Sequence, residues 1–177
     1  MNPLRDLRQN KVRDWIGKFG RTKILDIGSG NYPISDKAIT LDIQESKKPD
    51  YVGSVLNMPF DSGCFDCISC LEVIEHFERR EQIQALKEIR RVLSKDGIVI
   101  FSIPNSSKYL SLAQKWVWFV REHTTQSEYH HNEFTHAHIG LISPEIFLRQ
   151  LENLGFQILV QRRFFLYDFL VVCKLPS

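Results

Sequence analysis

The stretch ILDIGSGNYPISDKAITLDIQ, residues 24–44, decides the fold of this chain. It begins with a short apolar run, turns at Gly28-Ser29-Gly30, and ends with a second apolar run that closes on Asp42. Apolar runs that are rich in β-branched residues and end at glycine are typical of buried strands. Two such strands joined by a glycine turn indicate the start of a parallel sheet, with the turn at the carboxyl end of the first strand.

Strands and helices are expected to alternate along the rest of the chain, which is the pattern of a parallel sheet covered on both faces. Strands are expected at residues 23–28, 38–43, 50–55, 65–70, 98–103, 156–162 and 165–174. Helices are expected at residues 78–93 and 107–120, and between the N-cap residue Ser143 and Gly155. Because the last two strands lie close together in sequence, one of them is expected to be antiparallel. The predicted fold class is a doubly wound α/β domain.

The composition fits one soluble domain. The chain has 177 residues, enough to bury a core, and its apolar share of 43% and charged share of 25% are ordinary for a globular protein. Its 23 Lys and Arg against 21 Asp and Glu leave a net charge of +2, which gives no strong nucleic-acid signal. No secretory segment follows Met1 and no apolar run reaches membrane-spanning length, so a cytoplasmic location without a membrane partner is expected.

Residues 1–22 are predicted to form an N-terminal helix of the same domain as residues 23–177. The segment is basic, yet its apolar side chains fall roughly on one helical face. These are Leu4, Leu7, Val12, Trp15, Ile16 and Phe19. A covering helix with a solvated basic side is favoured over a binding arm. Whether it covers its own sheet or that of a neighbour, and so whether the protein is a monomer or a homodimer, stays open.

Three cysteines, Cys64, Cys67 and Cys70, form a C-x-x-C-x-x-C pattern that invites a metal interpretation. However, Cys67 and Cys70 lie in the apolar run DCISC, where successive side chains of a strand point to opposite faces. Small buried thiols are therefore the favoured interpretation.

The residues around the glycine turn predict a particular ligand. A dinucleotide-binding turn would need a third glycine where this chain has Pro33, which disfavours a nicotinamide-dependent oxidoreductase. Asp26, just before the turn, suits a ligand with an ammonium or sulfonium charge. Asp42, at the tip of the second strand, is placed to accept hydrogen bonds from two ribose hydroxyls. Together with Gly28 and Gly30, these acids predict a site for S-adenosylmethionine.

Five segments occur in a characteristic order along most of the chain. They are LDIGSG (25–30), LDI (41–43), LNMPFDSGCFDCISCLEVIEHF (56–77), RVLSKDGIVIFSIPN (91–105) and LISPEIFLRQLENLGF (141–156). As a set they resemble the class I S-adenosylmethionine-dependent methyltransferases, particularly the small type 11 group. The resemblance implies an enzyme with a Rossmann-like seven-stranded sheet of order 3-2-1-4-5-7-6, strand 7 antiparallel, and S-adenosylhomocysteine as the product of its cofactor.

The resemblance also implies which residues bind the cofactor: the glycine turn at its methionine end, the second strand tip at its ribose, residues 53–56 beside its adenine, and the end of the fourth strand beneath it. The expected cofactor-binding residues are Asp26, Gly28, Ser29, Gly30, Asp42, Ile43, Ser54, Val55, Leu71 and Glu72.

Two departures from the family pattern matter. Only residues 31–37 separate the glycine turn from the second strand, too few for a full helix, so the cofactor is either more exposed or covered by the N-terminal helix. Ser54 stands where the family often has aspartate, and because serine carries no charge, weaker cofactor binding is predicted.

Methyl transfer needs a general base only when the acceptor atom holds a proton. The candidate bases are His76, just after the fourth strand, and His131 and His136. His76 has the alternative role of holding its loop through hydrogen bonds. The histidine-rich and aromatic segment 106–140 is a candidate lid over the acceptor, the alternative being core aromatics with surface histidines.

A metal-dependent alternative rests on Glu72, Glu75 and His76, which form E-x-x-E-H, with His131 downstream. This is similar to the metal-binding pattern of the small-RNA 3′-terminal 2′-O-methyltransferases, but the chain lacks a strongly basic face for RNA. The favoured function is methyl transfer to an unidentified, small-molecule acceptor without a metal. An RNA 2′-O-methyltransferase and a non-catalytic S-adenosylmethionine-binding module are the alternatives.

Overall fold

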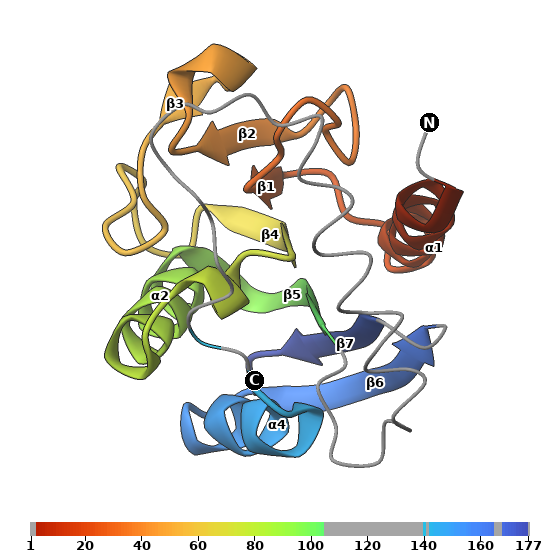
Figure 1. Ribbon diagram of the computed structural model, residues 1–177, viewed down its shortest axis with the longest axis vertical. Coiled ribbons are helices and arrows are strands. Elements are labelled where there is room, and N and C mark those ends of the chain that lie inside the picture. Colours follow the sequence, from red (N-terminus) through yellow and green to blue (C-terminus); the bar gives the residue numbers. More distant parts are fainter. Residues whose placement is uncertain (1–2, 105–139, 141, 165–167, 177) are drawn as a thin grey trace.

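A computed structural model describes residues 3–104, 140, 142–164 and 168–176 of the chain. Its helices and strands follow one another along the chain in the order expected from the sequence (Figure 1). The elements are α1 (Pro3–Lys18), β1 (Ile24–Ile27), β2 (Ile39–Asp42), η1 (Glu45–Lys47), β3 (Tyr51–Val52), β4 (Phe65–Leu71), η2 (Ile74–His76), α2 (Arg79–Val92), β5 (Leu93–Pro104), α4 (Pro144–Asn153), β6 (Gln157–Phe164) and β7 (Asp168–Lys174).

The strands form one seven-stranded sheet in the order β3-β2-β1-β4-β5-β7-β6 (Figure 1). β1 pairs in parallel with β2 and β4, and β4 pairs in parallel with β5. β7 is antiparallel to both β5 and β6. The fold class, the strand order and the antiparallel strand expected from the sequence are therefore confirmed. The carboxyl ends of β1, β2, β4 and β5 meet at one edge of the sheet, which is where open α/β sheets bind ligands.

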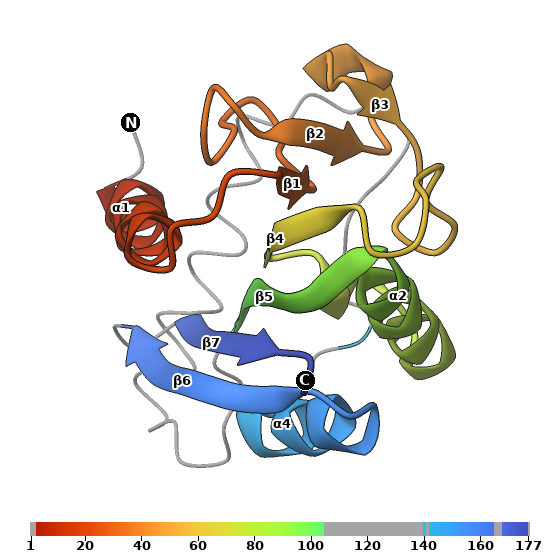
Figure 2. The same cartoon turned by 180° about the vertical axis from the view of Figure 1, so that it is seen from behind.

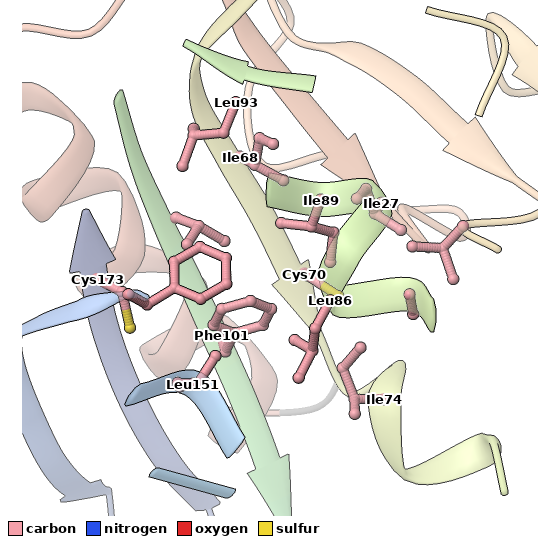
Figure 3. Close-up of a cluster of buried hydrophobic side chains, with 14 of the residues drawn as sticks. Ile27, Ile68, Cys70, Ile74, Leu86, Ile89, Leu93, Phe101, Leu151 and Cys173 are labelled. Atoms are coloured by element: carbon pink, nitrogen blue, oxygen red, sulfur yellow. The ribbon is translucent and has the colours of Figure 1, made fainter. Parts of the chain in front are cut away.

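One face of the sheet is covered by α2 and α4 (Figures 1 and 2). Its core holds Leu86 and Ile89 of α2, Leu151 of α4 and Phe101 of β5, all 0% exposed (Figure 3). The ring of Phe101 packs edge-on against that of Phe147, with their centroids 5.4 Å apart. Burying large apolar side chains contributes about 1.5–3 kcal/mol each, so this layer holds the strands in register.

The opposite face is covered by α1, which lies across the sheet from α2 (Figures 1 and 2). Val12, Trp15 and Ile16 are buried there, against strand residues that include Ile24. Leu7, expected on the same helical face, is instead 47% exposed. That expectation is wrong because Leu7 precedes Val12 by five residues, which places it about 140° away around the helix.

Several element boundaries differ from those expected. β5 begins at Leu93, five residues before the expected strand, because Leu93 pairs with Phe65 of β4. Residues 95–97, which lie between the helix expected at 78–93 and the strand expected at 98–103, belong to this strand. The expected N-cap Ser143 is confirmed, since its hydroxyl accepts a hydrogen bond from Ile146 N at 3.4 Å. The helix expected at 107–120 lies outside the described residues.

The four cysteines are free thiols. Cys67, Cys70 and Cys173 are 0% exposed, which confirms the buried-thiol interpretation for the two strand cysteines of the C-x-x-C-x-x-C pattern. Burial raises the pKa of Cys67 to about 12. Within the part of the chain that the structure describes, there is also no helix long and apolar enough to cross a membrane.

Candidate active site

The glycine turn after β1 depends on backbone conformations that favour glycine. Gly28 has φ +68° and Gly30 has φ +54°. Gly28 N donates a hydrogen bond to Leu41 O of β2 at 2.8 Å, which draws the turn against the neighbouring strand. A Cβ atom at Gly28 would collide with Cγ2 of Val73, in the segment that follows β4. Gly28 therefore permits both the bend and the close approach of two loops at the carboxyl edge of the sheet.

Asp42, at the end of β2, lies beside the glycine turn and is hydrogen-bonded to it. Its Oδ2 accepts a hydrogen bond from Gly30 N at 2.9 Å, and its Oδ1 accepts one from Gln44 N at 2.9 Å. A carboxylate has about four acceptor positions, so the half-buried Asp42 keeps capacity for two further donors. The structure thus brings Gly30 and Asp42 together, and vicinal hydroxyl groups are the kind of donors that such a carboxylate can bind.

Asp26 has a different environment from Asp42. Its side chain is 4% exposed, its Oδ2 accepts a hydrogen bond from Ile34 N at 2.8 Å, and its Oδ1 accepts one from Ser69 Oγ. Burial raises the pKa of Asp26 to about 6, against the opposing effect of these two hydrogen bonds. Its described contacts tie the loop after the glycine turn to β4. Sequence reasoning did not identify Ser69, because nothing local marks which strand serine faces Asp26.

Residues 31–37, all of them described, form no helix between the glycine turn and β2. Helix α1 is bonded to this loop instead. Gln9 Nε2 donates to Tyr32 O at 2.8 Å, Arg13 Nε donates to Ile34 O at 2.8 Å, and the Arg5 guanidinium lies 3.5 Å from the centre of the Tyr32 ring. The N-terminal helix therefore supports the loop that a longer helix would otherwise stabilise.

The segment after β4 carries the second half of the site. Glu72, directly after Leu71, has φ +57°, a conformation that costs a non-glycine residue about 1–2 kcal/mol. Its backbone N–H donates to Ser102 O at 3.1 Å, and its Oε1 accepts a hydrogen bond from Ser102 Oγ at 2.8 Å. Ser102 of β5 thus fixes Glu72 in a strained position, as is common at functional sites.

Arg8 of α1 joins Glu72 to the last strand. Its Nη1 lies 3.3 Å from Glu72 Oε1 and 3.1 Å from Asp168 Oδ2. The three side chains are largely buried, with exposed fractions of 13%, 22% and 8% in the order Arg8, Glu72 and Asp168. Arg8 was not expected as a site residue. The available signal was its position four residues before Val12, which places a charged side chain on the face of α1 that packs against the sheet.

Glu75, in η2, is fully buried at 0% exposure. Neither of its carboxyl oxygens has a hydrogen-bond partner among the described residues. Burial and the neighbouring Glu72 carboxylate raise the pKa of Glu75 well above its ordinary range. A buried acceptor without a donor costs about 1–3 kcal/mol, so such a group calls for a partner outside the contacts described above.

The chain returns to this edge of the sheet at Gly140. Gly140 N donates to the backbone oxygen of Glu75 at 3.0 Å. Gln82 Nε2 donates to Phe77 O at 3.1 Å and to Gly140 O at 2.7 Å. The stretch that leaves β5 after Pro104 therefore rejoins the described structure beside η2. His131, His136 and all but the last residue of the candidate lid 106–140 lie outside the described residues.

The expected adenine end of the site lies beside β2 and β3. Ile43 is 63% exposed and Val52 is 55% exposed, so two apolar side chains face solvent after Asp42 and at the end of β3. Ser54 Oγ accepts a hydrogen bond from Leu56 N at 3.2 Å, while Val55 is only 4% exposed and belongs to the core. Exposed apolar side chains beside a carboxylate provide a surface on which a flat ring can pack.

The proposed metal ligands are only partly brought together. Glu72 is held by Arg8 and Ser102, and His131 lies outside the described residues. Among the residues that the structure describes, no group of three or more His, Cys, Asp or Glu side chains is arranged to hold a metal ion.

Comparison with known proteins identifies the class of protein to which this site belongs. Residues 5–161 match the family model described as a methyltransferase domain, so the chain belongs to this methyltransferase family. No curated protein sequence gives a significant match.

Solved structures share the fold at low sequence identity. The PH0226 protein from Pyrococcus horikoshii OT3 superposes with a TM-score of 0.70 and 18% identity, covering 99% of this chain and 93% of that one. A SAM-dependent methyltransferase from Archaeoglobus fulgidus gives 0.67 and 17%, with 96% and 94% covered. Magnesium protoporphyrin IX methyltransferase from Synechocystis PCC 6803, solved with bound SAH, gives 0.69 and 15%, with 98% and 84% covered.

Proposed function

We propose that this methyltransferase takes its methyl group from S-adenosylmethionine and transfers it to a small-molecule acceptor. The observation that carries the proposal is the pairing of Gly30 with Asp42 at 2.9 Å, which sets a carboxylate with spare acceptor capacity at the mouth of the glycine turn. The use of this cofactor by the Archaeoglobus enzyme, and the SAH bound to the Synechocystis enzyme, support the same donor here.

The donor would lie across the carboxyl ends of β1, β2 and β4. Asp42 would bind its ribose hydroxyls, and the exposed side chains of Ile43 and Val52 would pack against its adenine. The glycine turn would lie against its methionine end, and Asp26 would tie the loop after the turn to Ser69 of β4. Ser29, Ser54 and Leu71 are further proposed contacts of the donor.

The chemistry requires the protein mainly to align its two substrates. Methyl transfer from a sulfonium is an in-line displacement in which the positive charge on sulfur disappears. Holding the two reactants in line and excluding water therefore supplies much of the rate. Where the acceptor atom carries a proton, a general base removes it, and His76, His131 and His136 are the candidate bases.

Calorimetric titration with S-adenosylhomocysteine tests the donor site. We expect the wild type to bind it, and Asp42→Asn to bind at least about tenfold more weakly, because a hydrogen bond to a charged acceptor contributes about 1.5–3 kcal/mol. Asp61→Asn, at an exposed aspartate in the turn before β4, is the matched control and should bind like the wild type. Wild-type protein that fails to bind, or Asp42→Asn that binds normally, contradicts the proposal.

Turnover separates an enzyme from a non-catalytic binding module. The protein is incubated with methyl-labelled S-adenosylmethionine and a fraction of small molecules from a cell extract. We expect label to appear in a small-molecule product with the wild type and to be strongly reduced with Asp42→Asn. Binding of the cofactor without transfer to any fraction would favour the non-catalytic module.

A further inference from the structure

Glu75 has acceptor capacity that the described part of the chain does not use. It is 0% exposed, and neither of its carboxyl oxygens has a hydrogen-bond partner among the described residues. Buried carboxyl groups are normally paired or hydrogen-bonded. The missing partner is a hydrogen-bond donor, and a ligand that brings an N–H or O–H group to this position would supply it.

The charges around Glu75 indicate the kind of donor. Glu75 interacts electrostatically with Glu72, Asp168 and Arg8. Three carboxyl groups thus share one guanidinium, and Arg8 Nη1 is already engaged by Glu72 at 3.3 Å and Asp168 at 3.1 Å. Counting only the described residues around Glu75, carboxyl groups outnumber cations, which is an environment that a cationic group complements.

The position of the cluster indicates which ligand reaches it. Asp168 pairs with Pro104 at the carboxyl end of β5, and Glu75 follows the end of β4. The proposed donor site extends from β2 across β1 to β4, so Glu75 and Asp168 lie on its far side. A group bound between them would belong to the acceptor rather than to the nucleoside of the donor.

We propose that Glu75 and Asp168 form an acceptor subsite that binds a cationic amino group. This inference rests on the proposed function and names the class of acceptor, an amine that is protonated when it binds. Glu75 supplies the unused acceptor oxygens, and Asp168 adds a second carboxylate. Arg8 Nη1 contacts both Asp168 and Glu72 and so fixes their positions beside Glu75. Because Arg8 Nε also lacks a partner among the described residues, an anionic group is the rival ligand.

Three matched probes test the charge of the ligand: 2-phenylethylamine, 2-phenylethanol and 3-phenylpropionate. Their binding is measured by ligand-observed NMR titration, with and without saturating S-adenosylhomocysteine. In the wild type we expect the amine to bind at least about tenfold more tightly than the other two. Glu75→Gln, which has the same shape but cannot ionise when the amine binds, should lose this preference, and Asp168→Asn should weaken it. Glu152→Gln, at an exposed position in α4, is the control and should keep it.

Other outcomes overturn the subsite. An amine that binds no better than the alcohol, or a preference that survives in both Glu75→Gln and Asp168→Asn, excludes it. Tighter binding of 3-phenylpropionate assigns the cluster to an anion through Arg8. An amine preference that S-adenosylhomocysteine abolishes assigns the cluster to the ammonium group of the donor. If EDTA-treated wild-type protein binds Mn²⁺ and the Glu75→Gln variant does not, the cluster is a metal site.

The two proposals fail in distinguishable ways. Protein that never binds S-adenosylhomocysteine contradicts the proposed function, yet its titrations without that compound still report whether the amine is preferred. Protein that binds S-adenosylhomocysteine but shows no amine preference keeps the proposed function and loses the subsite.

Discussion

The guanidinium of Arg8 lies 3.1 Å from the carboxylate of Asp168, although 160 residues separate the two in the sequence. This contact joins the first helix to the first residue of the last strand, and the same Nη1 atom reaches Glu72 after β4. Helix α1 is therefore tied to the carboxyl edge of the sheet by charge as well as by its apolar face. The contact predicts that α1 contributes to the stability of the site and of the whole domain.

Replacing Arg8 with methionine tests the contribution of its ion pairs with Asp168 and Glu72. Met keeps most of the apolar stem but leaves Asp168 and Glu72 without the guanidinium, and removing one partner of a buried ion pair costs about 3–5 kcal/mol. Because Glu72 keeps Ser102 and some exposure, we expect a loss of about 2 kcal/mol in the free energy of unfolding, measured with denaturant. Lys18→Met removes a pair with Asp14 whose lysine is 66% exposed, and should cost less than about 1 kcal/mol. Equal stability of the two variants would refute the tie.

Gly28→Ala should disrupt the glycine turn through a steric contact. The added Cβ meets Val73 Cγ2, so we expect greater destabilisation than the roughly 1–2 kcal/mol due to the left-handed backbone alone, and a loss of S-adenosylhomocysteine binding. Gly20→Ala is the matched control, because Gly20 has φ +62° and no atom of the described residues lies within 4 Å of the added Cβ. Adding Val73→Ala to Gly28→Ala should restore part of the stability, since it removes the obstructing methyl group. No rescue in calorimetric unfolding would show that the collision is not the cause.

The raised pKa of Asp26 makes the free energy of unfolding depend on pH in a specific way. Its pKa is raised from 3.8 to about 6 in the folded protein, so the folded state binds a proton more tightly than the unfolded state does. The associated stabilisation is fully present below pH 3.8 and is lost as the pH rises through about 6. Between pH 4.5 and pH 7.5 this corresponds to about 2 kcal/mol.

Asp26→Asn isolates this effect. The amide has the same shape, and its oxygen can still accept the hydrogen bond from Ile34 N. We expect the wild type to lose about 2 kcal/mol relative to Asp26→Asn between pH 4.5 and pH 7.5, since the other titrating groups are common to both proteins. The measurement is denaturant unfolding at several pH values. A difference between the two proteins that does not change with pH would show that Asp26 titrates normally.

The side chain of Gln82 is expected to stabilise the backbone around Gly140 beside η2. Gln82 is 2% exposed, and its amide bonds two backbone oxygens, those of Phe77 and Gly140. Gln82→Ala leaves both oxygens without this donor, which should cost about 1–3 kcal/mol and speed hydrogen exchange of the Gly140 amide. Gln84→Ala, at an exposed position of the same helix with a single bond to Leu56 O, should change neither by more than about 0.5 kcal/mol. Unchanged exchange in Gln82→Ala would contradict this role.

Much of the fold could be predicted because strands and helices leave local patterns. The glycine turn, the acidic residue at the tip of the second strand and the short loop 31–37 could all be read along the chain, and the family resemblance added the strand order. The expectation for Leu7 failed because the helical face was drawn too wide. Arg8 was missed for a different reason: the basic residues of the helix were expected on its solvated side, whereas Arg8 lies on the inner face.

The sequence alone determined which residue types stand at the ends of which strands, since period and turn chemistry are properties of neighbouring residues. Only the tertiary structure decided that Ser69 binds Asp26, that α1 supports the loop 31–37, and that Arg8 reaches Asp168. It also decided that Glu75 is buried with no hydrogen-bond donor from the residues that the structure describes. These relationships depend on how separate faces pack, and packing between distant segments leaves no periodic signal in either segment.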